Sequence, residues 1–331
     1  MNYKVSILVP LYNVSKFIEK CAVSLFEQTL QGVEFIFVND CTPDNSIEIL
    51  LQVIDKYPFL ENSIKIINHE TNRGLAAARN TGVKHAKGEY ILHVDSDDRI
   101  EFNMAALLYS EAKKTNADIV VCDFILEWEN TQKVVEQYWN SSPEIFNKMI
   151  LSLQAQPAVW NKLIRRELYT SNSIEVPAST NLGEDLVTIP KLIFFSKKIV
   201  KINTPLYYYN QTNELSYTKN FSIKNLTDAL NIFENLKDFF KANNKLDIYQ
   251  ASIDLGKVKT EIRLLLEADS KYWNEIHSKL GGIKTGDVFK SLTPKENFIF
   301  FLFSNNFFNT LKIYRNSYYR VFRVIQKFKG R

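Results

Sequence analysis

The feature that most constrains this chain is the alternation of short apolar runs and amphipathic stretches over its first 125 residues. Each run is apolar almost throughout, which predicts a strand buried on both faces of a sheet. The stretches between them repeat apolar residues every three to four positions, which predicts helices, the first of them capped by Ser15. Strands alternating with helices form a parallel sheet covered on both sides. The expected strands are residues 5–9, 34–38, 64–67, 90–94 and 118–122, and the expected helices are residues 17–26, 46–57, 75–87 and 102–115.

The composition is that of a folded protein. A length of 331 residues suggests about two domains, and 45% hydrophobic against 24% charged residues excludes a disordered chain. The three cysteines form no Cys-x-x-Cys pair and the four histidines have no metal-ligand spacing. We see no secretory signal and no apolar run of about 18 residues, so we expect a cytoplasmic protein.

The charge is distributed unevenly. The chain holds 41 basic and 37 acidic residues, a net charge of +4. Residues 295–331 hold eight basic residues and one acid, a balance of +7, which leaves residues 1–294 with 33 basic and 36 acidic residues, a balance of −3. A slightly acidic body without a basic stripe argues against a nucleic-acid partner.

The basic segment also carries many apolar residues. Residues 297–308 are apolar but too short to span a bilayer, and aromatic residues alternate with arginine and lysine in the stretch that follows. This composition is typical of a segment lying in an anionic membrane interface. It predicts that residues 295–331 hold the protein peripherally at the inner face of the membrane. The alternative is a C-terminal helix packed on the body with a basic outer face.

Polar residues follow four of the expected strands. In parallel sheets of this kind, ligands bind beyond the carboxyl ends of the strands. The segments at that edge are PLYN at 10–13, ND at 39–40, residues 69–74, and DSDD at 95–98. We therefore expect the chemistry of the protein to be located there.

The acidic segment at 95–98 is the strongest of these signals. Asp95, Asp97 and Asp98 place three carboxylates within four residues, and they repel one another unless a cation is present. Oxygen ligands of this kind suit Mg²⁺ or Mn²⁺, which commonly bind through one or two carboxylates together with phosphate oxygens. The alternative is a solvated acidic turn that caps the helix beginning near Phe102.

Three further positions allow both a functional and a structural interpretation. Asp40 could accept hydrogen bonds from a base or ribose, or it could be an ordinary turn residue. Arg79 lies in the first turns of an expected helix, where anions are attracted, or it is a solvated side chain on a packed helix. The pair Glu184 and Asp185 could supply a general base, or it caps the helical segment that follows.

Taken together, these stretches resemble the family-2 inverting glycosyltransferases of GT-A fold, in particular bacterial enzymes that build surface polysaccharides. Cys41 and Thr42 depart from the family pattern Asp-Gly-Ser-x-Asp, in which glycine and serine occupy their places, and this change bears on the shape of the loop. The matching stretches, in order over about the first 210 residues, are VSILVPLYN (5–13), FVNDCTPDNS (37–46), NRGLAAARNTG (72–82), YILHVDSDD (90–98), VWNKLIRRELY (159–169) and GEDLVTIPKL (183–192).

The resemblance implies an α/β fold of GT-A (Rossmann-like) type, with a mostly parallel sheet, helices on both faces and a helical C-terminal region. It also implies that three parts of the chain have different functions. Residues 1–125 would bind the nucleotide sugar, residues 126–215 would bind the acceptor, and residues 216–331 would form the helical region with its basic aromatic tail.

The resemblance also implies roles for individual residues. The nucleotide sugar would be bound by Pro10, Tyr12, Asn13, Asp40, Arg79, Asp95, Trp160 and Lys162. Pro10, Tyr12 and Asp40 would line the nucleobase pocket, and Arg79 would lie near the ribose or diphosphate. Asp95 would contact the ribose or donor sugar. Trp160 and Lys162 would border the sugar and diphosphate, with a core role for Trp160 as the alternative. Asp97 would be the main protein ligand of Mg²⁺ or Mn²⁺.

The implied reaction is a single displacement. A sugar would pass from a nucleoside-diphosphate sugar, expected to be a UDP-sugar, to a hydroxyl of a glycan or lipid-linked sugar with inversion. Asp185 would remove the proton of that hydroxyl, with Glu184 as the second choice. A sugar nucleotidyltransferase would instead have a glycine-rich basic loop after the first strand, where this chain has residues 10–13. A non-catalytic nucleotide-sugar-binding module stays open, because carboxylates bind metal with or without turnover.

Overall fold

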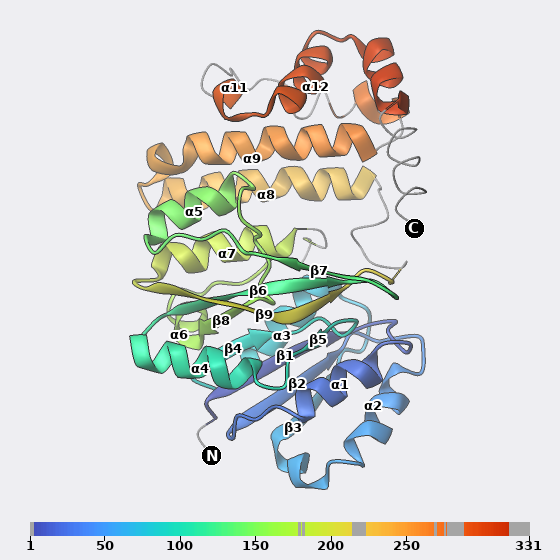
Figure 1. The fold of residues 1–331 in the computed structure, drawn as a ribbon, viewed down its shortest axis with the longest axis vertical. Helices are drawn as coiled ribbons and strands as arrows, with labels where there is room; N and C mark the ends of the chain where they lie inside the picture. Colours follow the sequence, from blue (N-terminus) through green and yellow to red (C-terminus); the bar gives the residue numbers. More distant parts are fainter. Residues whose placement is uncertain are drawn as a thin grey trace. The chain divides into compact units, whose positions relative to one another are not determined.

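The structure is a computed structural model that describes residues 3–177, 180, 183–213, 223–267, 270–274, 276 and 288–317. The chain divides into two compact units. The first comprises residues 1–150 and 154–219, and the second comprises residues 151–153 and 220–331. The first unit holds the sheet and the second is helical (Figure 1). A further division of the first unit near residue 125 stays a prediction.

The described residues of the first unit form a nine-stranded sheet in the order β3-β2-β1-β4-β8-β6-β9-β5, with β7 paired to β6 (Figure 1). The strands are β1 (Val5–Leu11), β2 (Val33–Asn39), β3 (Ile64–Asn68), β4 (Tyr90–His93), β5 (Arg99–Ile100), β6 (Ile119–Glu127), β7 (Gln132–Val135), β8 (Lys162–Arg165) and β9 (Ile199–Asn210). The five strands expected from the apolar runs are thus all present.

The half of the sheet that contains β3, β2, β1 and β4 is parallel, as the alternation predicts. Leu11 at the end of β1 pairs with Asn39 at the end of β2, and Asn39 pairs with Asn68 at the end of β3. The carboxyl ends of these strands therefore meet at one edge. Beyond β4 the sheet is mixed, because β8 runs antiparallel to both β4 and β6, whereas β6 and β9 are parallel.

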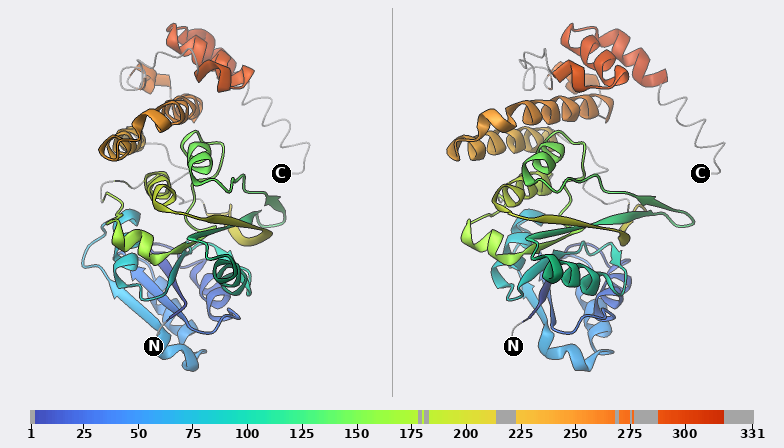
Figure 2. Two further views of the ribbon diagram at one scale, coloured as in Figure 1. Left: turned by 90° about the vertical axis from the view of Figure 1, so that its left-hand side faces the viewer. Right: turned by 60° about the vertical axis from the view of Figure 1, so that its left-hand side comes forward.

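Helices cover both faces of the parallel half. The first-unit helices are α1 (Ile18–Phe26), α2 (Ser46–Ile54), η1 (Pro58–Ser63), α3 (Leu75–His85), α4 (Met104–Thr115), α5 (Pro143–Leu151), α6 (Arg166–Ser171) and α7 (Glu184–Phe195). The odd-numbered residues of β1 pack in one apolar cluster with α1, α2 and α4. The even-numbered Leu8 faces α3, where Gly82 is so close that a Cβ would lie 3.4 Å from the leucine side chain. Figure 2 shows α4 beside β6 and β9, which it contacts.

Two helices have features that differ from what local sequence pattern predicts. Ser15 is not the N-cap of α1, which begins after Phe17 without a side-chain cap. The backbone amide of Ser15 is instead bound by a carboxylate from the next loop. Helix α7 continues through Pro190, and the side-chain amide of Asn147 donates to the Pro190 carbonyl at 2.9 Å.

The second unit is helical, which confirms the expected helical C-terminal region. Its elements are α8 (Ile223–Ala242), α9 (Leu246–Glu267), η3 (Ser270–Tyr272), α11 (Val288–Ser291) and α12 (Pro294–Ser304). Trp273 is buried in an apolar cluster with residues of α9 and α12, and its indole N–H donates to the Leu265 carbonyl. Across the described ranges, no helix combines the length and apolar character needed to cross a membrane. Residues 318–331 of the predicted tail lie outside the described residues.

Candidate active site

The loops after β1 and β2 are joined by a dense set of hydrogen bonds, which we call the loop cluster (Asn13, Ser15, Thr42, Asp44 and Ser46). Asp44 accepts from the Thr42 hydroxyl at 2.7 Å, from the Ser46 hydroxyl at 2.6 Å and from the Ser15 amide at 2.9 Å. Burial alone would raise the pKa of Asp44, but these hydrogen bonds outweigh it and lower the pKa to about 2. The loop cluster thus holds an ionised carboxylate that is fully used in positioning two loops.

The two residues that depart from the family pattern, Cys41 and Thr42, both have defined places in this loop. Thr42 supplies the hydroxyl of the usual serine: it donates to Asp44 and accepts from the amide of Asn13 at 2.8 Å. Cys41 has a left-handed backbone with φ of 57°, a conformation that glycine adopts without steric cost. Asn13 is also left-handed, with φ of 54°, and asparagine tolerates that conformation better than most residues.

Asp40 is buried at the end of β2 and holds the loop that leads into α3. One carboxylate oxygen accepts from the Arg73 amide at 2.8 Å and lies 2.7 Å from Nδ1 of His69, and the other accepts from the Gly74 amide at 2.7 Å. These contacts fix the loop through which the chain enters α3. Its predicted contact with a nucleobase stays a prediction.

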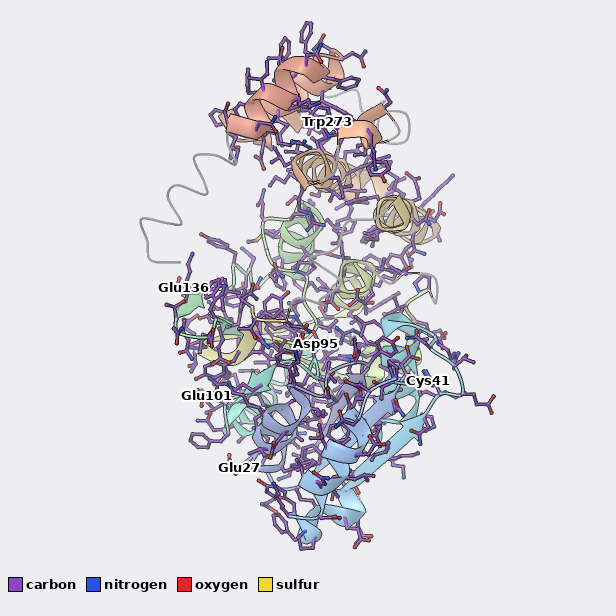
Figure 3. The ribbon with its side chains drawn as sticks, turned by 90° about the vertical axis from the view of Figure 1, so that its right-hand side faces the viewer. Glu27, Cys41, Asp95, Glu101, Glu136 and Trp273 are labelled. Atoms are coloured by element: carbon purple, nitrogen blue, oxygen red, sulfur yellow. The ribbon has the colours of Figure 1, made fainter. Side chains whose placement is uncertain are left out.

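The remaining residues of the predicted base pocket lie on β1 and just beyond it. Pro10 is a buried residue of the strand, whereas Tyr12 is 39% exposed and so presents part of its ring to solvent. Cys41 is exposed on the neighbouring loop, and in Figure 3 it lies at the side of the first unit while Asp95 lies toward the middle.

The three carboxylates of the acidic segment after β4 differ in their surroundings: Asp98 is buried, whereas Asp95 and Asp97 are partly exposed. Asp98 is buried and accepts from the Tyr207 hydroxyl at 2.6 Å and from the Asn210 amide at 2.7 Å. The same Tyr207 oxygen accepts from the Asp95 amide at 3.1 Å. Burial, followed by the nearby Asp97 and Asp95, raises the pKa of Asp98 well above its ordinary value. Asp98 therefore anchors the segment to β9.

Asp97 and Asp95 are less enclosed than Asp98. One Asp97 oxygen accepts from the side-chain amide of Asn213 at 2.8 Å, and burial, with Asp95 next, raises the pKa of Asp97. Within the described part of the chain, no three acidic, histidine or cysteine side chains converge as a ready-made metal site. Two hard carboxylate donors nevertheless fit a divalent ion that takes its other ligands from phosphate oxygens.

The centre of the site is what we call the arginine cluster: Arg79 of α3, Asp95 after β4, and Glu184 and Asp185 at the start of α7. Arg79 is 4% exposed, and its Nη2 lies 2.9 Å from Asp95, 3.4 Å from Glu184 and 3.9 Å from Asp185. Three sequence-predicted regions thus meet at one guanidinium group, although Arg79 and Glu184 are 105 residues apart in the chain.

The arginine cluster is incompletely hydrogen-bonded. Among the described residues, no hydrogen-bond partner reaches Nε or Nη1 of Arg79, or Oδ1 of Asp185. The other oxygen of Asp185 accepts from the Val159 amide at 3.2 Å. Buried polar atoms are normally paired, so the three unpaired atoms gathered here set the arginine cluster apart from the rest of the described core.

The electrostatics of the arginine cluster favour protonation of Glu184 and Asp185. One guanidinium faces three carboxylates, so part of the negative charge is uncompensated. Burial, then Asp185, raises the pKa of Glu184 to about 8 against the opposing effect of Arg79. Burial also raises the pKa of Asp185, with Arg79 again opposing it. A carboxylate with a raised pKa is a better general base near neutral pH than an ordinary one.

Trp160 and Lys162 are both buried beneath the site. Trp160 is 4% exposed and stacks on the Tyr207 ring with centroids 4.4 Å apart, which matches the alternative of a core role. The Lys162 amine donates to the carbonyls of Gln156 and Ala158 and to the side chain of Asn161. Burial lowers the pKa of Lys162 to about 7. Contact between Lys162 and a diphosphate would require this side chain to move.

Tyr207 and Asn213 belong to the site although nothing in the motifs pointed to them. Tyr207 lies on β9 and reaches the acidic segment 112 residues earlier in the chain. The run Tyr207-Tyr208-Tyr209 was visible in the sequence, but alternation on a strand turns neighbouring side chains to opposite faces. Only the pairing of β9 with β5 and β6 shows which tyrosine meets Asp98.

Comparison with known proteins identifies the family of the chain. The model of the family described as glycosyl transferase family 2 matches residues 6–179. The putative glycosyltransferase EpsH of Bacillus subtilis is 32% identical over 257 residues, which are 76% of this chain and 73% of EpsH.

Solved structures show the same fold at lower identity. Residues 1–349 of S. aureus TarS superpose with a TM-score of 0.70 at 20% identity, covering 96% of this chain and 91% of the TarS chain. TarS has also been solved with UDP-GlcNAc. The mannosyltransferase PcManGT of Pyrobaculum calidifontis, solved with GDP-Man and Mn²⁺, has a TM-score of 0.54 at 14% identity, covering 94% and 87% of the two chains. The likeness to TarS confirms the expected GT-A fold.

Proposed function

The chain belongs to glycosyltransferase family 2, and we propose that it transfers a sugar from a UDP-sugar, with inversion, to a hydroxyl of a surface glycan or a lipid-linked sugar. The observation that carries this proposal is the arginine cluster. It joins the acidic segment after β4 to the carboxylates of α7 through one buried guanidinium.

Asp185 is the group we assign as the general base. An acceptor hydroxyl attacks an anomeric carbon poorly while it keeps its proton, and a positioned carboxylate removes it during the attack. The Val159 amide orients one oxygen of Asp185, and the other oxygen has no hydrogen-bond partner among the described residues. That oxygen, which lies 3.9 Å from Nη2 of Arg79, is the atom that we propose accepts the proton. A single displacement with one base and no protein nucleophile inverts the anomeric configuration.

Arg79 positions the carboxylates and limits their basicity. Its charge opposes the pKa increase that burial causes in Glu184 and Asp185. Without that charge the pKa of both groups would rise further. Glu184, with the pKa raised to about 8, is the second choice for the base.

Asp97, together with Asp95, would hold Mg²⁺ or Mn²⁺ if the enzyme uses a divalent ion. Their oxygen donors suit either ion, and the excess negative charge around Asp95 attracts a cation. The chemistry that a bound ion supplies is neutralisation of the charge on the departing diphosphate. The ordered Asn213–Asp97 and Tyr207–Asp98 contacts keep this segment in place.

Uridine is the base we expect in the donor, since TarS has been solved with UDP and UDP-GlcNAc. The exposed ring face of Tyr12 and the edge formed by β1 and β2 are the part of the chain that would bind it. A thermal-shift comparison of uridine and guanosine diphosphate sugars with Mn²⁺ tests this choice. Stabilisation by guanosine sugars alone would show that the base is wrong.

Azide rescue of Asp185→Ala tests the role of the base directly. Azide attacks without losing a proton, so it needs no general base. We expect transfer to a hydroxyl acceptor to fall by about 10²–10⁴-fold and azide to restore release of the nucleotide, with a glycosyl azide of inverted configuration as product. Asp55→Asn, at an exposed aspartate after α2, serves as the control and should leave transfer unchanged. Normal hydroxyl transfer by Asp185→Ala, or an azide product of retained configuration, would overturn the assignment.

A further inference from the structure

The second unit has four aromatic side chains at its surface, three exposed and one half-buried, that we call the aromatic patch: Phe298, Phe301, Phe307 and the half-buried Tyr314. Phe298 and Phe301 lie three residues apart on α12 (Figure 1) and therefore share one face. Phe298 contacts Tyr314 with ring centroids 5.3 Å apart, and Phe301 contacts Phe307 at 6.2 Å. The three phenylalanines are 45%, 52% and 50% exposed, so each presents about half of its side chain to water.

This surface is additional to the apolar face that α12 already uses for folding. Ile299, Phe300, Leu302 and Phe303 are buried in the core of the second unit. A helix on a water-exposed surface normally carries polar residues opposite its buried face. On α12 the opposite face carries Phe298 and Phe301 instead. An exposed apolar surface that folding does not need points to a partner.

Charge identifies the kind of partner. The segment from residue 295 to 331 has a balance of +7, with Glu296 as its one acid. That acid is used inside the fold, because its carboxylate accepts from the Thr293 amide at 2.7 Å in a capping box. Lys295 continues the stripe of Phe298 and Phe301 at the same helical spacing, and Lys312 is exposed on the helical stretch 308–317. Phenylalanine rings edged by basic side chains are complementary to an anionic, partly apolar surface.

We propose that the aromatic patch docks on an anionic membrane surface, with its rings in the acyl–headgroup boundary and the basic side chains on the lipid headgroups. Helix α12, Pro294–Ser304, is too short to cross a bilayer but long enough to lie in its interface. A second copy of the chain is a poorer occupant, since two basic segments would repel each other across such a contact. This docking is independent of the glycosyl transfer proposed above.

Vesicle flotation of the full chain tests the proposal. We expect flotation with phosphatidylcholine vesicles that contain phosphatidylglycerol, and little flotation with phosphatidylcholine alone. The double variant Phe298→Ser, Phe301→Ser should lower the partition coefficient by at least about tenfold. Lys312→Glu reverses one charge and should lower it by at least about fivefold, with a smaller effect at high salt. Phe59→Ser is the matched control, because Phe59 is 76% exposed in the first unit, and it should float like the wild type.

Two results would overturn the membrane assignment. One is equal flotation of the wild type and the double variant, or equal flotation on neutral and anionic vesicles. The other is a wild type that does not float but self-associates in light scattering, with the double variant monomeric, which would make the aromatic patch a contact between copies. Circular dichroism melting of each variant confirms that a loss of flotation is not a loss of folding.

Discussion

The loop cluster and the arginine cluster are both polar, and both join segments distant in sequence, yet their hydrogen bonding differs. In the loop cluster both oxygens of Asp44 accept hydrogen bonds, and its pKa falls to about 2. In the arginine cluster, atoms of Arg79 and Asp185 have no hydrogen-bond partner among the described residues, and the pKa of Glu184 rises to about 8.

This difference in hydrogen bonding indicates that the loop cluster stabilises the fold and that the arginine cluster is the reacting centre. A satisfied buried polar group stabilises the fold, because its hydrogen bonds replace those it had with water. An unsatisfied one costs stability and persists where function requires it. The two clusters should therefore respond oppositely to mutation and to pH, and each of the following changes tests that contrast.

Arg79→Met should have the largest effect on stability. It removes the cation that three buried or half-buried carboxylates share, and breaking a buried ion pair from one side costs about 3–5 kcal/mol. The loss should be smaller at pH 5 than at pH 8, because protonation relieves the remaining repulsion. Urea unfolding at the two pH values measures it. An equal loss at both values would mean that the carboxylates are not coupled to Arg79.

Asp44→Asn should destabilise the protein by about 2 kcal/mol, since it weakens several hydrogen bonds to a charged group. The folded pKa of Asp44 lies below its ordinary value of 3.8. Its contribution is therefore fully present above that value and is lost as the pH falls toward about 2. Denaturant midpoints between pH 2 and pH 6 should show this acid loss in the wild type and a smaller one in the variant. The same slope in both would contradict the scaffold role.

Glu184→Gln should stabilise the protein, whereas Asp44→Asn should destabilise it. The folded pKa of Glu184 lies above its ordinary value of 4.5, so the folded protein loses stability as the pH rises from about 4.5 to about 8. The variant lacks this ionisation and should be more stable than the wild type at pH 8, by at least about 1 kcal/mol, with little difference at pH 4. Thermal melting across this range checks the result. A variant less stable at pH 8 would show that Glu184 is a stabilising partner of Arg79.

Cys41→Gly should give the smallest effect, a gain of about 0.5 kcal/mol. Cys41 holds a left-handed backbone, which costs a side-chain-bearing residue more than glycine, although glycine also gains entropy in the unfolded chain. Pro43→Gly, in the same loop, is the control and should destabilise. A destabilised Cys41→Gly would mean that the exposed thiol makes a stabilising contact.

Much of the first unit could be predicted from local pattern, because its strands are continuous apolar runs and its helices have apolar stripes. The edge where Asp40, Asp95 and the β1 loop lie follows from the rule for parallel sheets. The sequence context of Arg79 and Asp185 leaves a functional and a structural interpretation open, and the family resemblance assigns their roles. The contact between these residues requires α7 to pack near α3, although more than a hundred residues separate Arg79 from the start of α7. No local sequence pattern predicts that packing.

The parts that sequence reasoning missed depend on long-range pairing. Asp98 looks like Asp95 and Asp97 in the sequence, and only Tyr207 on β9 makes it an anchor. Lys162 resembles a diphosphate ligand, but the bend before β8 turns its amine onto backbone carbonyls. Serine is a common N-cap residue, but the backbone amide of Ser15 is bound by Asp44, and α1 begins only after Phe17.

The central claim is that the arginine cluster carries out the transfer reaction, while the loop cluster stabilises the fold. Single-turnover transfer per folded molecule, measured for Asp185→Asn and Asp44→Asn at a saturating UDP-sugar concentration, tests it most directly. We predict that Asp185→Asn loses about 10²–10⁴-fold in rate with an unchanged or raised melting temperature. Asp44→Asn should melt earlier but transfer within a few-fold of the wild type. A normal rate in Asp185→Asn, or a larger rate loss in Asp44→Asn, would contradict the account.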